Sequence, residues 1–205
     1  HVADATANAF HARQLTTRRP RVTANAQRAT PRPRGRILAY PAAVRASTVT
    51  VMRIAMANDH AGTSLKLEIA AWLRDQGHEV EDFGAHDELP CDLPDHVYPA
   101  ALAVASAACD RGIFVDGVGY GSAMIANKLP GVFAAVAQDP FCAWLARSHS
   151  DSNVLCIGGK IIGSALAMEV VKSWMTTDWL GTSDEKYARR VAKVVEIAER
   201  HVRPL

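Results

Sequence analysis

Three polar clusters in the sequence carry side chains that exchange protons. The first is Asn58-Asp59-His60, the second is Asp116 with the glycine loop that follows it (Gly117, Val118, Gly119, Tyr120, Gly121 and Ser122), and the third surrounds His149. Carboxylates and imidazoles are common general acids and bases. Glycines let backbone N–H groups approach a ligand closely, and a loop that opens a helix favours negative charge. These residue types suit acid–base chemistry on a ligand that develops negative charge.

The glycine loop does not match the two common phosphate-binding fingerprints. The dinucleotide fingerprint Gly-x-Gly-x-x-Gly follows the first strand of its unit and needs an acid about 20 residues further on. Here Ser122 replaces the last glycine, and the loop follows the third predicted strand. No Gly-Lys-Ser/Thr follows it either, as a Walker loop requires. On spacing alone, a tight strand-to-helix turn without a ligand stays open.

The elements that must position these clusters alternate between strand and helix after Met52. Short apolar runs predict strands at 52–57, 78–83, 112–116, 132–137 and 154–157. Helices are predicted at 65–73, 99–108, 122–128, 141–148, 163–174 and 184–202. Five strands alternating with helices predict a parallel, doubly wound sheet, because right-handed crossovers place helices on both faces.

In such sheets ligands bind beyond the carboxyl ends of the strands, where the strand order reverses. The loop after the first strand holds Asp59 and His60, and the loop after the third holds Asp116. The loops after the fourth and fifth strands are expected near His149 and Gly158-Gly159. The sequence therefore predicts one site at this edge.

The composition fits one soluble domain with an appendage. The chain has 205 residues, of which 49% are hydrophobic and 21% charged. Its four cysteines form no Cys-x-x-Cys pair, which argues against a zinc ribbon or a disulfide framework and favours the cytoplasm. No apolar run reaches the roughly 18 residues of a membrane span, and the N-terminus lacks a secretory signal.

The N-terminal segment differs in charge from the rest. Residues 1–50 hold nine arginines and one acidic residue, whereas 51–205 hold 14 basic and 20 acidic residues. The arginines have no interleaved aromatic residues, which disfavours nucleic-acid binding. The segment also resembles an organellar transit peptide, although its prolines prevent a long amphipathic helix. We expect residues 1–51 to be a basic, weakly ordered extension or to pack on a partner, and 52–205 to form the domain with its C-terminal helix.

A set of short motifs occurs in the chain in a fixed order. They are Asn58-Asp59-His60-Ala61-Gly62 with Lys66, Asp92-x-Pro94-Asp95, Asp110-Arg111-Gly112-Ile113, Gly117-x-Gly119-x-Gly121, Ala126-Asn127-Lys128-x-Pro130-Gly131, Ala146-Arg147-x-His149-x-Asp151-x-Asn153-Val154 and Gly158-Gly159. This ordered set resembles the type B ribose-5-phosphate isomerases, a family that also contains the subunits of galactose-6-phosphate isomerase. The resemblance covers about residues 52–192.

The resemblance implies an enzyme that interconverts aldose and ketose sugar phosphates without metal or cofactor. It implies an α/β, Rossmann-like, doubly wound five-stranded parallel sheet with helices on both faces. It also implies a homodimer, often paired further to a tetramer, with sites shared between subunits. The expected ligand is a small phosphosugar, with neither nucleic acid nor a membrane as partner.

The resemblance also implies roles for single residues. His149 resembles the residue that opens the furanose ring, Asp59 resembles the acid that assists at the ring oxygen, and His60 touches the phosphate. The amides of the glycine loop suit stabilisation of an enediolate. Substrate contacts are further expected at Asn127, and at Lys186 and Arg190 of a C-terminal segment that usually reads Arg-His-x-x-Arg in the family. Here Tyr187 stands in place of its histidine.

The chain departs from the family at the position of the catalytic base. That base is usually a cysteine just before the glycine loop or a glutamate just after it, and here these places hold Asp116 and Ser122. Burial would make Asp116 a better proton acceptor, so it is the candidate base. It is alternatively inert, as in a non-catalytic or regulatory subunit that binds a phosphosugar. A nucleotide-binding module is a weaker alternative, because the fingerprint does not match.

The nature of the sugar stays open at this stage. Leu93 replaces an aromatic residue of the family's acidic loop, and Ser150 replaces an asparagine after the motif histidine. Ribose 5-phosphate and a hexose 6-phosphate such as galactose 6-phosphate are therefore both candidate substrates.

Overall fold

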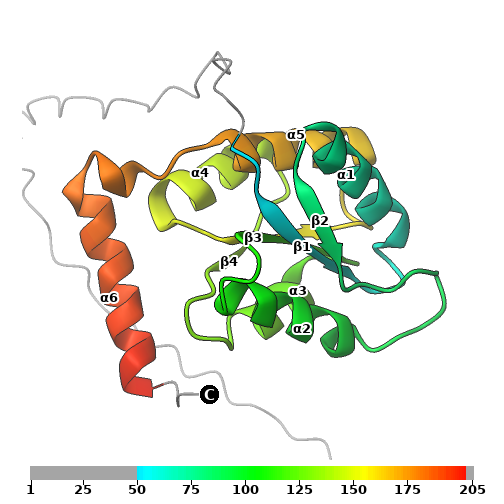
Figure 1. Cartoon of the computed structure of the whole chain (residues 1–205), viewed down its shortest axis with the longest axis horizontal. Coiled ribbons are helices and arrows are strands. Elements are labelled where there is room, and N and C mark those ends of the chain that lie inside the picture. Colours follow the sequence, from blue (N-terminus) through cyan, green and yellow to red (C-terminus); the bar gives the residue numbers. More distant parts are fainter. Residues whose placement is uncertain (1–49, 202–205) are drawn as a thin grey trace, which may run out of the picture. The chain divides into compact units, whose positions relative to one another are not determined.

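Five parallel strands form one sheet in the computed structural model, which describes residues 50–201 (Figure 1). The strands are β1 (Arg53–Asn58), β2 (Glu79–Asp82), β3 (Arg111–Asp116), β4 (Ala134–Val136) and β5 (Val154–Gly158). Their order across the sheet is β2-β1-β3-β5-β4. The predicted doubly wound α/β fold is confirmed.

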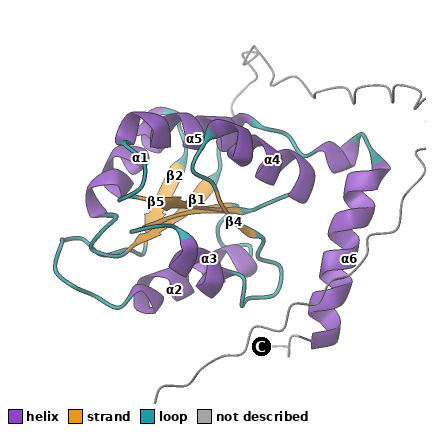
Figure 2. Cartoon of the chain, turned by 180° about the vertical axis from the view of Figure 1, so that it is seen from behind, coloured by secondary structure: helices purple, strands orange, loops and turns teal. Residues whose placement is uncertain are grey.

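The helices cover both faces of this sheet. They are α1 (Thr63–Asp75), α2 (Leu93–Ala105), α3 (Tyr120–Ala126), α4 (Pro140–Ser150), α5 (Ser164–Thr176), the 3-10 turn η1 (Leu180–Thr182) and α6 (Glu185–His201). Figure 2 shows α1, α4 and α5 on one face and α2 and α3 on the other. Each face has its own apolar core, one centred on Ile69, Leu73 and Trp174 and the other on Val97 and Phe114.

The three central strands are apolar on both sides because both sides are covered. The last five residues of β1, the last five of β3 and all of β5 are buried. This pattern is typical of parallel strands between two helical layers. The edge strand β2 instead alternates exposed and half-buried residues.

The strand order reverses between β1 and β3, and the carboxyl ends of these strands lie at the edge where the sequence predicts a site. Asn58 and Val115 are register partners in this pair of strands. The next residues along each strand, Asp59 and Asp116, therefore reach the same edge of the sheet side by side.

The predicted helices at 99–108 and 122–128 both begin and end earlier in the structure, and the larger shift is in α2. We predicted a helix at 99–108 after an acidic loop, but α2 begins at Leu93. Asp92 has the extended backbone of an N-cap, and Pro94 lies in the first turn, where a missing N–H costs nothing. The helix ends at Ala105, since Ala107 takes a left-handed conformation with φ of 58°.

The C-terminal helix α6 has a single buried side chain among its described residues, Tyr187. It lies beside α4 and η1 at one side of the molecule (Figure 1). Val194 and Ile197 on this helix are about half exposed.

Across residues 50–201, no helix combines the length and the apolar character that crossing a bilayer would require. The extension predicted at 1–51 lies outside the described residues, except for its last two.

Candidate active site

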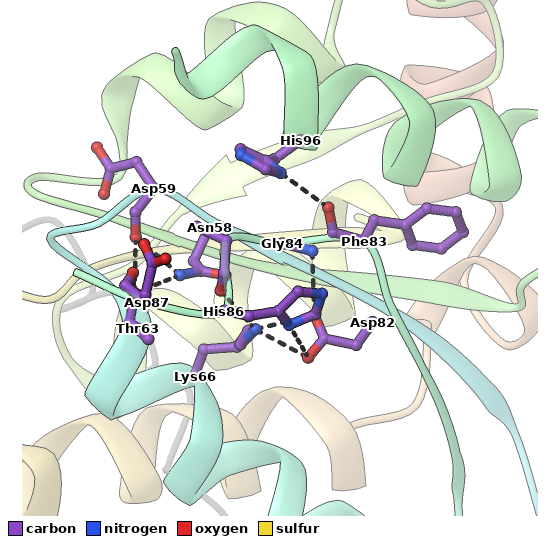
Figure 3. Close-up of polar contacts among 11 residues, drawn as sticks. Asn58, Asp59, Thr63, Lys66, Asp82, Phe83, Gly84, His86, Asp87 and His96 are labelled. Carbon is purple, nitrogen blue, oxygen red and sulfur yellow. Dashed lines mark hydrogen bonds and ion pairs between the residues drawn. The ribbon is translucent and has the colours of Figure 1, made fainter. Parts of the chain in front are cut away.

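The loop after β1 is held rigidly by the side chain that ends the strand. Asn58 is fully buried, and its Nδ2 donates to the Asp59 carbonyl at 2.7 Å and to Thr63 Oγ1 at 2.9 Å (Figure 3). The Ala61 amide donates to Asp59 Oδ1 at 2.9 Å. Asp59 Oδ2 has no partner among residues 50–201, and Figure 3 shows the carboxylate turned away from the neighbouring Lys66 and Asp82. Asp59 thus has a fixed backbone and one oxygen available to a ligand.

A buried lysine on α1 binds the segment after β2, next to this loop. The Lys66 side chain is fully buried, and its Nζ donates to both carboxylate oxygens of Asp82 at 2.9 and 2.8 Å and to the Ala85 carbonyl at 3.0 Å (Figure 3). One turn earlier on α1, Thr63 Oγ1 donates to the Asp87 carbonyl at 2.8 Å. The start of α1 therefore ties the Asp59 loop to the segment after β2. The sequence showed Lys66 only as part of a motif and gave it no role.

Asp116 is bound by its own glycine loop. Its Oδ1 accepts hydrogen bonds from the Val118 amide at 2.8 Å and from the Gly119 amide. Its Oδ2 accepts from the Ser122 amide at 2.8 Å and from Ser122 Oγ at 2.6 Å. Gly119 can follow this path because its φ is 84°, a conformation that favours glycine. Four donors therefore surround a carboxylate that is only 3% exposed.

This arrangement changes the predicted use of the loop amides. We expected the amides of residues 117–122 to receive a substrate oxyanion, but those of Val118, Gly119 and Ser122 are engaged by Asp116. In the described part of the chain, the Tyr120 and Gly121 amides of the first turn of α3 keep no acceptor. The prediction considered burial of Asp116 alone and did not include the hydrogen bonds that both carboxylate oxygens accept within the loop.

Asn127 lies at the end of α3 and is fixed by the neighbouring strand. Its amide donates to the Ala134 carbonyl and its oxygen accepts from the Ala134 amide, both at 2.9 Å. It borders an open pocket together with Tyr120, Met124, Lys128 and Val136. The residue thus faces the surface beside the glycine loop, with its amide group hydrogen-bonded to β4, and its contact with substrate stays a prediction.

The structure places His149 at the opposite edge of the sheet from Asp116, which corrects the expected position. The loop after β4 ends at Asp139, where α4 begins, and His149 is in the last turn of that helix. Because α4 runs back along the sheet, its end leads into the first residue of β5. Asp116 is the last residue of β3, a strand whose six residues span roughly 20 Å from one edge of the sheet to the other. His149 follows β4 in the sequence, and the prediction wrongly placed it at the carboxyl end of that strand.

His149 instead lies near Lys186 and Arg190, the predicted phosphate ligands on α6. Its ring stacks on Tyr187 with centroids 4.4 Å apart, and Trp144 lies 5.7 Å away on its own helix. Lys186 Nζ and the Arg190 guanidinium lie 4.5 and 5.8 Å from the Tyr187 ring centroid. Burial, and then the positive charges of Lys186 and Arg190, lower the pKa of His149 below its ordinary value. The imidazole is therefore neutral at pH 7 and able to take a proton.

The described residues thus form two partial sites. One holds Asp59, His60, Asp116 and the glycine loop at the carboxyl edge, and the other holds His149, Lys186 and Arg190 at the amino edge. Between Thr50 and His201, no three histidine, cysteine or acidic side chains lie close enough together to hold a metal ion. A single chain does not bring the two partial sites together.

Comparison with known proteins covers the region that holds both partial sites. The sequence model of the Ribose/Galactose Isomerase family matches residues 54–194. Ribose-5-phosphate isomerase B of Escherichia coli is 37% identical over 148 residues, which cover 72% of this chain and 97% of that protein. The 4-deoxy-4-sulfo-D-erythrose isomerase of a Clostridium species is 33% identical over 135 residues, 65% of this chain and 85% of that one.

A solved structure agrees with the sequence comparison. Ribose-5-phosphate isomerase B of Clostridium thermocellum superposes with a TM-score of 0.70 at 39% identity, covering 73% of this chain and 99% of that chain. The matched region contains both partial sites, and the resemblance seen in the motifs is confirmed. The chain therefore belongs to the ribose/galactose isomerase family.

Proposed function

We propose that this protein is an aldose–ketose isomerase that acts on a sugar phosphate through an enediolate and needs no cofactor. The observation that carries the proposal is the pair of carboxylates, Asp59 and Asp116, at the point where the strand order reverses. The family match supports the reaction class. Ribose 5-phosphate and ribulose 5-phosphate are the first candidates, and a hexose 6-phosphate such as galactose 6-phosphate is the second.

The reaction requires a proton to move between two adjacent carbons. Asp116 takes the proton from C2 of the aldose, and the C–H electrons form the C1–C2 double bond while the carbonyl electrons move to the oxygen on C1. The unpartnered amides of Tyr120 and Gly121 suit that oxygen. The proton then returns to C1, the oxygen on C1 gains a proton, and the C2 hydroxyl loses one to become the ketose carbonyl.

Asp116 can act as this base only if one of its four hydrogen bonds opens. Three donors are backbone amides with fixed directions, whereas the Ser122 hydroxyl rotates about its C–O bond. We assign Ser122 as the donor that turns away when substrate binds.

Ring opening and phosphate binding need the second partial site. Neutral His149 takes the proton of the anomeric hydroxyl, the O–H electrons form the C1 carbonyl as the bond between C1 and the ring oxygen breaks, and Asp59 delivers a proton to the ring oxygen. The phosphate is held by His60 at one edge of the sheet and by Lys186 and Arg190 at the other. The Arg190 guanidinium can form bidentate hydrogen bonds with it. Because one chain separates these groups, each complete site takes its two halves from two copies, in a homodimer or tetramer.

The four free cysteines of the described region suit a reducing compartment, so we place the enzyme in the cytoplasm.

A non-catalytic phosphosugar-binding subunit is the second candidate. The hydrogen bonds that occupy Asp116 favour it, because they leave the carboxylate without a free lone pair at rest.

The test is a panel of ribose, allose, galactose and tetrulose phosphates, assayed with the wild-type chain and with Asp116→Asn. We expect wild-type turnover of at least one sugar, and a loss of 100-fold or more in kcat in the variant with sugar phosphate still bound. Binding without turnover in the wild type would support the non-catalytic subunit. Unchanged turnover in Asp116→Asn would remove Asp116 from the mechanism.

A further inference from the structure

Tyr187 is the point at which α6 meets the catalytic histidine. It is 4% exposed and stacks on His149 with ring planes inclined at 24°. Tyr187 is the third residue of α6, a helix that packs against η1 and α4. Tyr187 is the single buried side chain among the described residues of this helix, and it is the one that stacks on His149.

The same ring also gathers the two cations of the segment. Lys186 Nζ and the Arg190 guanidinium both lie within about 6 Å of its centroid, the range of a cation–π interaction. Lys186 is further held by Asp184, whose carboxylate lies 2.6 Å from Nζ. One aromatic ring thus joins the imidazole and both predicted phosphate ligands into one unit.

The environment of His149 depends on this ring. His149 Nε2 is enclosed and has no hydrogen-bond partner within the region that the structure describes. The charged groups that face the imidazole come from α6, and they are Lys186 and Arg190. On its own helix, Arg147 is paired with Asp151, and η1 contributes no titratable side chain. Burial comes first among the causes of the lowered pKa of His149, and Tyr187, whose ring stacks on the imidazole, is one of the side chains that bury it.

We propose that Tyr187 is a positioning residue that orients the His149 imidazole and keeps it neutral while holding Lys186 and Arg190 beside it. This inference rests on the proposed function, in which His149 takes a proton. Tyr187 touches no reacting atom in this account. Its ring makes the contact with His149, whereas its hydroxyl interacts with Lys186, which Asp184 also holds.

The experiment follows the titration of His149 by NMR in the full chain, with the His149 signals assigned by their loss in His149→Gln. In the wild type and in Tyr187→Phe, His149 should titrate below the ordinary value of about 6.5. In Tyr187→Ala its pKa should rise toward that value, because water reaches the ring and the two cations lose their anchor. Tyr98→Ala, which removes a tyrosine that is 47% exposed on α2, should leave the titration unchanged.

Activity gives a second readout. Tyr187→Ala should lower kcat/KM for the sugar phosphate by tenfold or more and move the acid limb of its pH profile upward, whereas Tyr187→Phe should stay within about threefold of wild type. If Tyr187→Ala does not fold, Tyr187→Leu takes its place and should show the same rise. An unchanged His149 pKa in the folded variant would overturn the inference. Because the titration needs no substrate, a failure of the proposed function would not be confused with this result.

Discussion

At Asp116 the chain places a carboxylate where three backbone amides of its own loop converge. This carboxylate both shapes the loop and, in our proposal, removes the substrate proton. The two tasks compete, since each hydrogen bond that orders the loop occupies a lone pair of the base. The Ser122 hydroxyl resolves this competition because it is the single donor of the four that rotates.

At the same scale, two histidines make the stability depend on pH. Burial lowers the pKa of both His149 and His78, with Arg111 adding to the effect at His78. A lowered folded-state pKa means that the unfolded chain binds more protons, so stability falls as the pH drops below the unfolded value of about 6.5. We predict a smaller free energy of unfolding at pH 5.5 than at pH 7.5, measured by urea denaturation.

The double variant His78→Gln/His149→Gln provides the control for this prediction. It should show a smaller loss between the two pH values than the wild type, because the histidine contribution is gone. An equal loss in both proteins would mean that other groups cause the pH dependence.

At the scale of elements, the start of α1 acts as a clamp between two loops. Lys66 pairs with Asp82 and Ala85, and Thr63 reaches the Asp87 carbonyl. Removing the lysine leaves a partly buried carboxylate without its cation. We predict that Lys66→Met lowers the free energy of unfolding by about 3 kcal/mol in urea denaturation.

The double variant Lys66→Met/Asp82→Leu tests the cause. Replacing both charges by apolar groups should recover most of the lost stability, because no unpaired charge then remains. If the double variant is as unstable as Lys66→Met, the loss comes from packing rather than from the unpaired carboxylate.

The sequence predicted the elements well because their signals are local. Apolar runs located all five strands, and the strand-and-helix alternation gave the parallel sheet. The start of α2 was missed because Pro99 looked like a beginning, whereas Asp92 and Pro94 carry the stronger N-terminal signal. The loop residues Asp59 and Asp116 were placed correctly at the carboxyl edge, since the topology alone fixes that edge.

The features that the sequence did not predict depend on the direction in which α4 runs and on contacts between side chains. His149 was assigned to the wrong edge because its position is set by the full length of α4. The hydrogen bonds of Asp116 to its own loop, and the contact between Tyr187 and His149, join side chains whose geometry no spacing rule specifies. The ordered motifs still named Asp116 and His149 as site candidates through the family resemblance, and their roles stay predictions.

At the scale of the whole molecule, apolar side chains remain exposed beside the glycine loop and along α6. Tyr120 and Met124 on α3 are 55% and 68% exposed, and Ile197 on α6 is 57% exposed. A second copy would cover such residues. We predict a dimer or larger assembly in sedimentation equilibrium, and a shift toward monomer in Met124→Glu. A monomeric wild type that is fully active would contradict the shared site.

The most direct test of the account mixes two inactive variants. Asp116→Asn and His149→Gln should each lose activity alone, since every site in either assembly lacks one group. A mixed dimer would contain one site with neither substitution, so co-expression in equal amounts should restore about a quarter of the wild-type activity. Native mass spectrometry would establish that mixed dimers form. If they form and the mixture is no more active than the separate variants, sites completed by a second copy are contradicted.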